Sequence, residues 1–278
     1  IHGLSGDDVL SGGAPGEGSD ILDGGRGNDT AVFNFNLADA ALVATPTGTV
    51  EVTIGAEEDE VVDVETLVFN DQTITAAEAD ALAGIVRGTA VGETLAGTAA
   101  DETFVGAGGN DVINAGAGND AIIWNVGDGR DVVNGGGAAG DVDTLFINGD
   151  AALTETFRIY TRAAAIAAGL NPGGLANEIV ITRTVNGAPD GNADRIALVR
   201  NIEELEINVR PITGATVARG DNVEIFGDFT QTSLALNTIT INGSSGDDTV
   251  DISALNSAHR IVFHANGGKD TLLGTLRP

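Results

Sequence analysis

Acidic side chains recur at a nine-residue spacing in the middle of the chain. Four consecutive nonapeptides, which together cover 88–123, align without a gap. The eighth place of each is apolar, and the sixth place is acidic, filled in turn by Glu93, Glu102, Asp111 and Asp120. Carboxylate oxygens are ligands that Ca²⁺ prefers, and the last two nonapeptides approach the pattern G-G-x-G-x-D-x-U-x, which is typical of calcium-binding parallel β-structures. The spacing therefore predicts a stack of calcium-binding loops.

The same pattern returns towards both ends of the chain. Two nine-residue copies, 3–11 and 24–32, flank an expanded copy at 12–23. The remaining copies lie at 127–134, 135–146, 243–251 and 266–274. A single glycine-rich loop would be weak evidence for a metal site, whereas copies at a fixed spacing are strong evidence.

Glycines in these copies give the predicted loops their shape. Glycine accepts the positive φ of a tight turn, which residues with a Cβ resist. Such a turn directs backbone carbonyls and one carboxylate to the same point, where hard oxygen ligands suit calcium. The predicted calcium-binding residues are Asp8, Asp20, Asp29, Asp111, Asp120, Asp131, Asp143, Asp248 and Asp270, with the glycines Gly3, Gly6, Gly24, Gly27, Gly106, Gly109, Gly116, Gly118, Gly129, Gly135, Gly246 and Gly268.

The composition agrees with a calcium ligand and excludes several other partners. Asp and Glu number 41 against 13 Lys and Arg, so the formal charge is −28. A chain without a basic patch does not attract nucleic acid or anionic membrane surfaces. Cysteine is absent, so metal rather than disulfides must hold the loops together. No apolar run is long enough for a transmembrane helix, and we expect a piece of a longer chain, since the sequence opens in mid-pattern and lacks methionine.

The elements that must position these loops are β-strands. We predict an all-β fold of parallel β-roll segments with strand-rich flanks and two short helices, at 75–84 and 161–169. The segment 47–54 alternates apolar and polar residues, as a half-buried strand does. Segment 63–70 resembles 201–208, which suggests a duplicated unit of roll and flank. The predicted divisions are a first roll at 1–33, a flank with a helix at 34–86, a second roll at 87–147, a flank at 148–240 and the start of a third roll at 241–278.

The nonapeptides resemble those of the repeat-in-toxin (RTX) family of secreted calcium-binding proteins. In that family successive repeats alternate between two sides, and each calcium lies between loops two repeats apart. The resemblance implies no evident partner for Asp20, and it places the Glu93 and Glu102 loops in doubt because Val91 and Ala100 replace the turn glycine. The pairs that it implies are Asp8 with Asp29, Asp111 with Asp131 and Asp120 with Asp143, together with Asp248 and Asp270 if 252–265 supplies the intervening turn.

A second resemblance covers 150–278 and is carried by the runs ETFRIYTRAAAIAAG (155–169), LNTITINGSSGDDTVDISAL (236–255) and HRIVFHANGGKDTLLGTLRP (259–278). These runs are similar to the C-terminal region of very large secreted bacterial RTX proteins, some with an animal-type haem peroxidase domain. The resemblance implies a non-catalytic, calcium-folded module that supports secretion and folding outside the cell, with the rest of a parent chain as its partner. One alternative is a calcium-rigidified adhesion or surface-layer segment with a glycan or cell-surface partner. Another is a polysaccharide-active enzyme, for which Tyr160 with Arg158 and Arg162 is the best candidate cluster.

Overall fold

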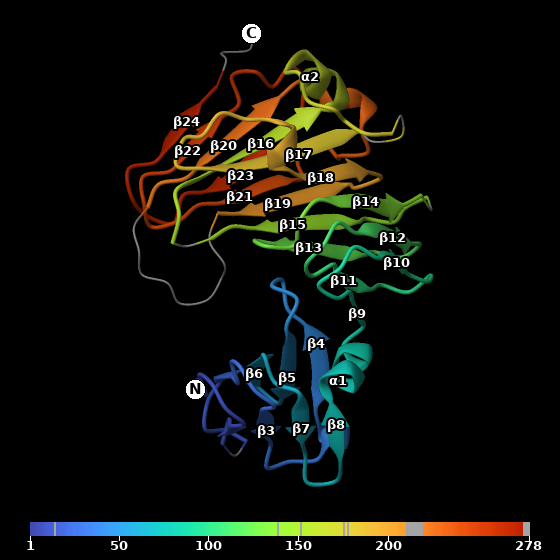
Figure 1. Cartoon of the computed structure of the whole chain (residues 1–278), viewed down its shortest axis with the longest axis vertical. Helices are drawn as coiled ribbons and strands as arrows, with labels where there is room; N and C mark the ends of the chain where they lie inside the picture. The colour runs from blue at the N-terminus through green and yellow to red at the C-terminus, as the bar shows by residue number, and fades with distance from the viewer. Residues whose placement is uncertain are drawn as a thin grey trace. The chain divides into compact units, whose positions relative to one another are not determined.

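The computed structural model describes residues 1–13, 15–137, 139–150, 152–174, 176, 178–209 and 219–274. Parts of the predicted segments 148–240 and 241–278, notably 210–218 and 275–278, lie outside these residues. The chain divides into two compact units, Ile1–Val86 and Arg87–Pro278. Each unit is built from two sheets, and strands dominate both units (Figure 1).

The first unit contains two four-stranded sheets. The first sheet is made of β1 (Val9–Ser11), β3 (Thr30–Val32), β7 (Thr66–Val68) and β8 (Thr73–Thr75), and the second of β2 (Ile21–Asp23), β6 (Glu57–Val62), β5 (Val50–Ile54) and β4 (Ala41–Ala44). In the first sheet β1, β3 and β7 are parallel, and β8 is antiparallel at the edge. In the second sheet β2 and β6 are parallel, and β5 and β4 continue the sheet in antiparallel order. A 3₁₀ turn, η1 (Leu37–Asp39), precedes β4.

The second unit is a longer roll whose strands also fall into two sheets. The seven-stranded sheet comprises, in order, β23 (Ile261–His264), β21 (Ile239–Asn242), β19 (Glu204–Asn208), β15 (Thr144–Asn148), β13 (Ala121–Asn125), β11 (Thr103–Val105) and β9 (Ile85–Arg87). The nine-stranded sheet comprises β10 (Thr94–Ala96), β12 (Val112–Gly116), β14 (Asp131–Gly136), β18 (Arg195–Arg200), β17 (Ile179–Val185), β16 (Glu155–Thr161), β20 (Asn222–Phe226), β22 (Thr249–Asp251) and β24 (Thr271–Leu273). Short 3₁₀ turns lie at η2 (Asn192–Asp194) and η3 (Phe229–Gln231).

The nonapeptide spacing sets the register of the parallel strands. Successive repeats alternate between the sheets, so Phe104 pairs with Ile122, which pairs with Leu145 in the next strand of the same sheet. Leu205 and Ile239 continue this column, and all five side chains are buried. The eighth-place residues thus form the core of a parallel β-roll, because parallel pairing in register stacks like side chains above one another.

The flanking segments interrupt the parallel order rather than form separate sheets. In the nine-stranded sheet, β17 is antiparallel to both β16 and β18, while β14–β18 and β16–β20 are parallel. Strands from the predicted segments 87–147, 148–240 and 241–278 therefore share the same two sheets. The division at 147 and 240 stays a prediction.

Two α-helices occur in the described ranges, at the positions expected from their caps. α1 (Ala76–Leu82) begins after Thr75, whose side chain accepts the N–H of Glu78 while the Glu78 carboxylate accepts the N–H of Thr75. α2 (Arg162–Ala167) is capped by the hydroxyl of Thr161. Each helix follows a strand directly because the cap residue is still extended.

Candidate metal centre

Sixth-place acids lie at the starts of stacked strands and are joined by a repeated hydrogen bond. The backbone N–H of one acid donates to a carboxylate oxygen of the acid in the next rung of the same sheet. We call each such row a carboxylate ladder. The described pairs among the predicted residues, with their N···O distances, are Asp8–Asp29 at 2.8 Å, Asp111–Asp131 at 2.9 Å, Asp120–Asp143 at 2.9 Å and Asp248–Asp270 at 2.9 Å.

The ladders continue through acids that the sequence interpretation missed. The expectation that Asp20 lacks a partner is wrong, since its N–H donates to Asp59 Oδ1 at 2.9 Å across 39 residues. Asp59 lies in an antiparallel excursion of the chain, where no repeat pattern marks it. Other missed members are Glu65, which accepts from Asp29, Glu203, which accepts from Asp143, and Asp221, which accepts from Glu155 and donates to Asp248.

The similarity of two segments in the sequence marks Glu65 and Glu203. They occupy the same place in the two similar segments 63–70 and 201–208. Each segment opens with a residue in the left-handed conformation, Asp63 at φ 47° and Asn201 at φ 51°. Each then presents its glutamate to the last aspartate of the preceding repeats. The duplicated motif is therefore the element that ends a carboxylate ladder.

The turn glycines lie where stacked loops approach most closely. Gly129 has φ 90°, and a Cβ there would lie 1.6 Å from the carbonyl oxygen of Gly109 in the adjacent loop. Only glycine fits this combination of positive φ and close approach. Gly3, Gly24, Gly106 and Gly135 face the carboxylate of their own loop; Gly27, Gly109, Gly116, Gly118, Gly246 and Gly268 lie against the backbone of the loop stacked before them; Gly6 has φ 112° in the first loop.

Four carboxylate oxygens are buried without a hydrogen-bond partner in the described part of the chain. They are the Oδ2 atoms of Asp8, Asp29, Asp111 and Asp120. A buried polar atom without a partner is rare and costly. A Cβ at Gly106 would lie 2.9 Å from Asp111 Oδ2 and 3.5 Å from Asp131 Oδ2, so carboxylates of two rungs face the same glycine cradle. These oxygens have the chemistry of cation ligands.

The two glutamate loops of the central run differ, because their own threonines satisfy the carboxylates. Glu93 accepts the N–H and the hydroxyl of Thr89 at 2.7 and 2.8 Å. Glu102 accepts the same groups of Thr98 at 2.8 and 2.6 Å. Both glutamates stand at the start of a ladder and donate their N–H to the following aspartate. Their side chains do not need a metal ion.

Burial raises the pKa of five of the predicted ladder aspartates, Asp111, Asp120, Asp131, Asp143 and Asp248. The pKa of Asp120 rises to about 6 and that of Asp131 to about 7, mainly through burial and further through neighbouring carboxylates. Asp128, in the loop before Asp131, is also buried, and its pKa rises to about 6. Two carboxylates at the ~4.8 Å spacing of strands repel by about 3 kcal/mol at an effective dielectric of ~20. A divalent cation between rungs would remove this penalty.

Side chains alone do not complete a metal shell here. Among the described residues, no group of three or more His, Cys, Asp and Glu side chains is arranged to hold a metal ion. Calcium takes six to eight oxygen ligands, which include backbone carbonyls. The residues present fit calcium held jointly by paired carboxylates and by the carbonyls of the glycine loops.

The candidate catalytic cluster around Tyr160 is divided among separate structural contacts. Tyr160 is buried and donates to Asp190 at 2.9 Å. Arg158 Nε pairs with Glu224 at 2.8 Å, and Arg162 Nη1 donates to the carbonyl of Gly174 at 2.6 Å. The three residues therefore contact different partners.

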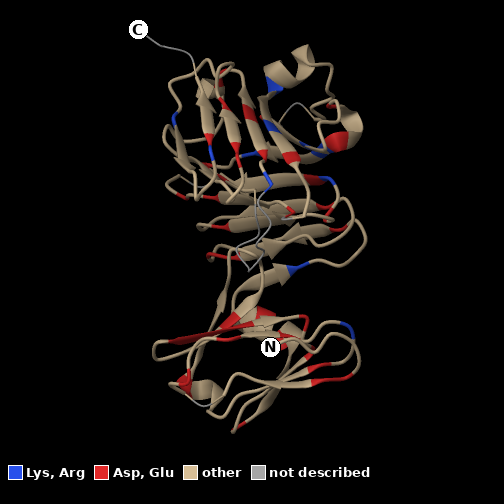
Figure 2. Cartoon of the chain, turned by 90° about the vertical axis from the view of Figure 1, so that its left-hand side faces the viewer, with Lys and Arg blue, Asp and Glu red and all other residues tan. Residues whose placement is uncertain are grey.

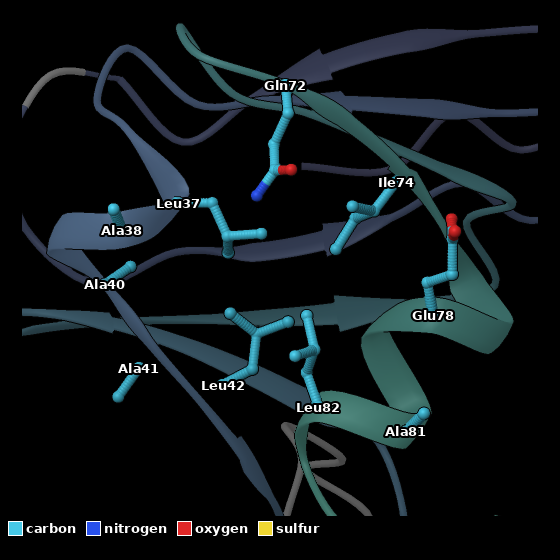
Figure 3. Close-up of a pocket in the computed structure, with 10 residues that line it drawn as sticks. All are labelled: Leu37, Ala38, Ala40, Ala41, Leu42, Gln72, Ile74, Glu78, Ala81 and Leu82. Atoms are coloured by element: carbon cyan, nitrogen blue, oxygen red, sulfur yellow. The ribbon is translucent and has the colours of Figure 1, made fainter.

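A hollow of about 810 Å³ in the first unit offers little chemistry. Figure 3 shows mostly apolar side chains around it, among them Leu37, Leu42, Ile74 and Leu82. Gln72 and Glu78 are its polar lining residues, and the Glu78 carboxylate is held by the cap of α1.

The charge distribution agrees with a cationic ligand. Acidic positions outnumber basic ones in both units, most strongly in the first (Figure 2). No helix in the described part of the chain is long and apolar enough to cross a membrane.

Comparison with protein families supports this assignment. The family described as RTX calcium-binding nonapeptide repeat matches four copies, over residues 1–14, 15–31 and 88–123. A comparison with curated proteins finds no match. The matched segments contain Asp8, Asp29, Asp111 and Asp120, whose buried oxygens lack partners. The chain therefore carries RTX-type calcium-binding nonapeptide repeats, and its strands form a parallel β-roll.

Proposed function

We propose that the chain is a module that folds on binding several calcium ions and supports the folding of a secreted bacterial protein outside the cell. The observation that carries this proposal is the set of four buried, unpartnered oxygens on Asp8, Asp29, Asp111 and Asp120. Calcium is abundant outside cells and scarce in the cytosol. The formal charge of −28 would therefore keep the loops apart until export.

The proposed calcium sites are the aspartate rungs. Their Oδ2 atoms, with the carbonyls of the stacked glycine loops, would supply hard oxygen ligands, and calcium would neutralise the paired carboxylates. The Glu93 and Glu102 loops would bind no ion of their own, because Thr89 and Thr98 already satisfy those carboxylates.

The module itself is proposed to be non-catalytic. The RTX repeat is a calcium-binding motif rather than a catalytic one, and the contacts of Tyr160 and its arginine neighbours are accounted for structurally. Its partner would be the remainder of a larger chain, as the resemblance of 150–278 implies.

A calcium titration tests the proposal. Circular dichroism in EGTA should show a loosened chain that becomes β-rich on adding calcium in the range of about 10⁻⁴–10⁻³ M, which is typical of extracellular modules. Light scattering in the same titration should show a monomer. A spectrum and melting temperature that EGTA leaves unchanged would contradict the proposal, while calcium-dependent self-association would favour the adhesion alternative.

A further inference from the structure

One rung of the ladders already contains a cation that belongs to the protein. Glu155 begins β16 and stands at a sixth-place position, since its N–H donates to Asp221 Oδ1 at 2.7 Å as in the aspartate rungs. Its side chain is fully buried. Arg183 on β17 donates its Nε to Glu155 Oε1, and the two form an ion pair in which the arginine side chain is 16% exposed.

The Glu155 loop brings a carboxylate and a carbonyl to one glycine as the proposed calcium loops do, but Glu155 Oε2 also accepts the N–H of Asp150 at 2.6 Å, so Oε1 is the oxygen left for a cation. A Cβ at Gly149 would lie 2.4 Å from Glu155 Oε2 and 3.0 Å from the carbonyl oxygen of Val209. At the aspartate rung of Asp143, a Cβ at Gly135 would likewise lie 2.6 Å from the carboxylate and 2.1 Å from the carbonyl of Asn201. Both loops therefore bring a carboxylate and a carbonyl from another rung to one glycine.

The antiparallel strand explains how an arginine reaches this position. Arg183 lies directly opposite Phe157, which is fully buried, so both side chains share the inner face of the sheet. A charged residue on that face is costly unless it is paired. Arg183 Nη2 is buried without a hydrogen-bond partner among the described residues, whereas Nε is bonded to Glu155.

We propose that Arg183 takes the place of calcium at the Glu155–Asp221 rung, so that this rung binds calcium only when the arginine is removed. The inference rests on the proposed calcium function of the other rungs. The roll would then contain rungs that need calcium and a central segment, β16 and β17, in which Arg183 neutralises the buried Glu155 carboxylate. That segment can stay ordered when calcium is absent.

The number of bound calcium ions tests this directly in the whole chain, by native mass spectrometry at saturating calcium. Arg183→Met should bind one ion more than the wild type, and adding Glu155→Gln should remove that ion. Arg158→Met is the matched control, since Arg158 also lies on this hairpin and pairs with Glu224 outside any ladder; it should bind the wild-type number. An unchanged count in Arg183→Met would overturn the proposal.

Hydrogen exchange of the wild type in EGTA provides a second test, which does not depend on whether a variant folds. Amides of β16 and β17 should exchange more slowly than those of β12 and β13, and equal exchange would overturn the proposal.

The calcium counts distinguish a failure of this proposal from a failure of the proposed calcium function. No calcium on the wild type but one ion on Arg183→Met would overturn only the calcium function of the other rungs, whereas no ion on either protein would overturn both.

Discussion

Replacing Asp120 by asparagine should change the stability in opposite directions with and without calcium. The wild-type Oδ1 accepts the N–H of Glu102 at 2.9 Å, and Oδ2 has no partner. Asparagine keeps the acceptor, removes the charge and places an N–H₂ group where Oδ2 lies. The substitution therefore separates the cost of the buried charge from its value as a calcium ligand.

The magnitudes follow from the site. Burial moves the Asp120 pKa from 3.8 to about 6, which corresponds to about 3 kcal/mol at 1.36 kcal/mol per unit and to roughly 1 kcal/mol after solvent screening. Asp120→Asn in EGTA at pH 8 should thus be about 1 kcal/mol more stable than the wild type. At ~10 mM calcium and a Kd of ~10⁻⁴ M, one site contributes about 2.7 kcal/mol to the wild type, and the variant should lose most of it.

Chemical denaturation in EGTA and in calcium measures both effects. Glu102→Gln is the matched control because Thr98 already satisfies that carboxylate; it should change the stability by less than about 0.5 kcal/mol in either buffer. If Asp120→Asn lowered the stability equally in both buffers, the aspartate would be a structural turn residue and the reasoning would be refuted.

Three further outcomes are expected. Gly129→Ala should lower the free energy of unfolding by several kcal/mol in thermal melting, because its Cβ would lie 1.6 Å from the Gly109 carbonyl oxygen. The control Gly140→Ala, at a position with φ 101° but open space, should lower it by only about 1–2 kcal/mol. Equal decreases in the two variants would argue against close stacking of the loops. In EGTA the melting temperature should rise as the pH falls from 8 towards 5, because the pKa of Asp131 in the folded chain is raised to about 7 and its ionisation destabilises the fold above that pH. In calcium the melting temperature should instead fall over the same pH range, because protons compete with the ion for the carboxylate. The same trend in both buffers would contradict this reasoning. The calcium-loaded chain should show no polysaccharide cleavage in a reducing-sugar assay, and an activity lost on Tyr160→Phe would favour the enzymatic alternative.

The difference between the Glu93 and Asp111 loops became visible only in the folded chain. In sequence, Val91 beside Glu93 suggested a poor turn and hence a weak site. The structure adds that Thr89 satisfies the carboxylate, so the longer side chain bends back into its own loop. At Asp111 no described group of the loop donates to Oδ2, which stays without a partner, whereas Asp248 Oδ2 accepts the N–H of Ser244 at 2.6 Å.

The sequence by itself determined the repeating part of the molecule. The nine-residue period and the apolar eighth place predict strands that stack two repeats apart, and Phe104 pairs with Ile122 as that period requires. Helix α1 was equally local, since its capping box lies within four residues of Thr75. These features depend on neighbours in the chain or on a fixed period, so no knowledge of the chain path is needed.

Only the tertiary structure decided how the ladders end and where they are neutralised. Asp59 meets Asp20 across 39 residues, and Glu203 meets Asp143 across 60, and neither Asp59 nor Glu203 lies in a repeat. Arg183 reaches Glu155 because an antiparallel strand enters an otherwise parallel sheet. The physical reason is that the hydrogen-bond ladder fixes partners within a period, whereas partners from the intervening segments depend on the path by which each excursion returns to the sheet.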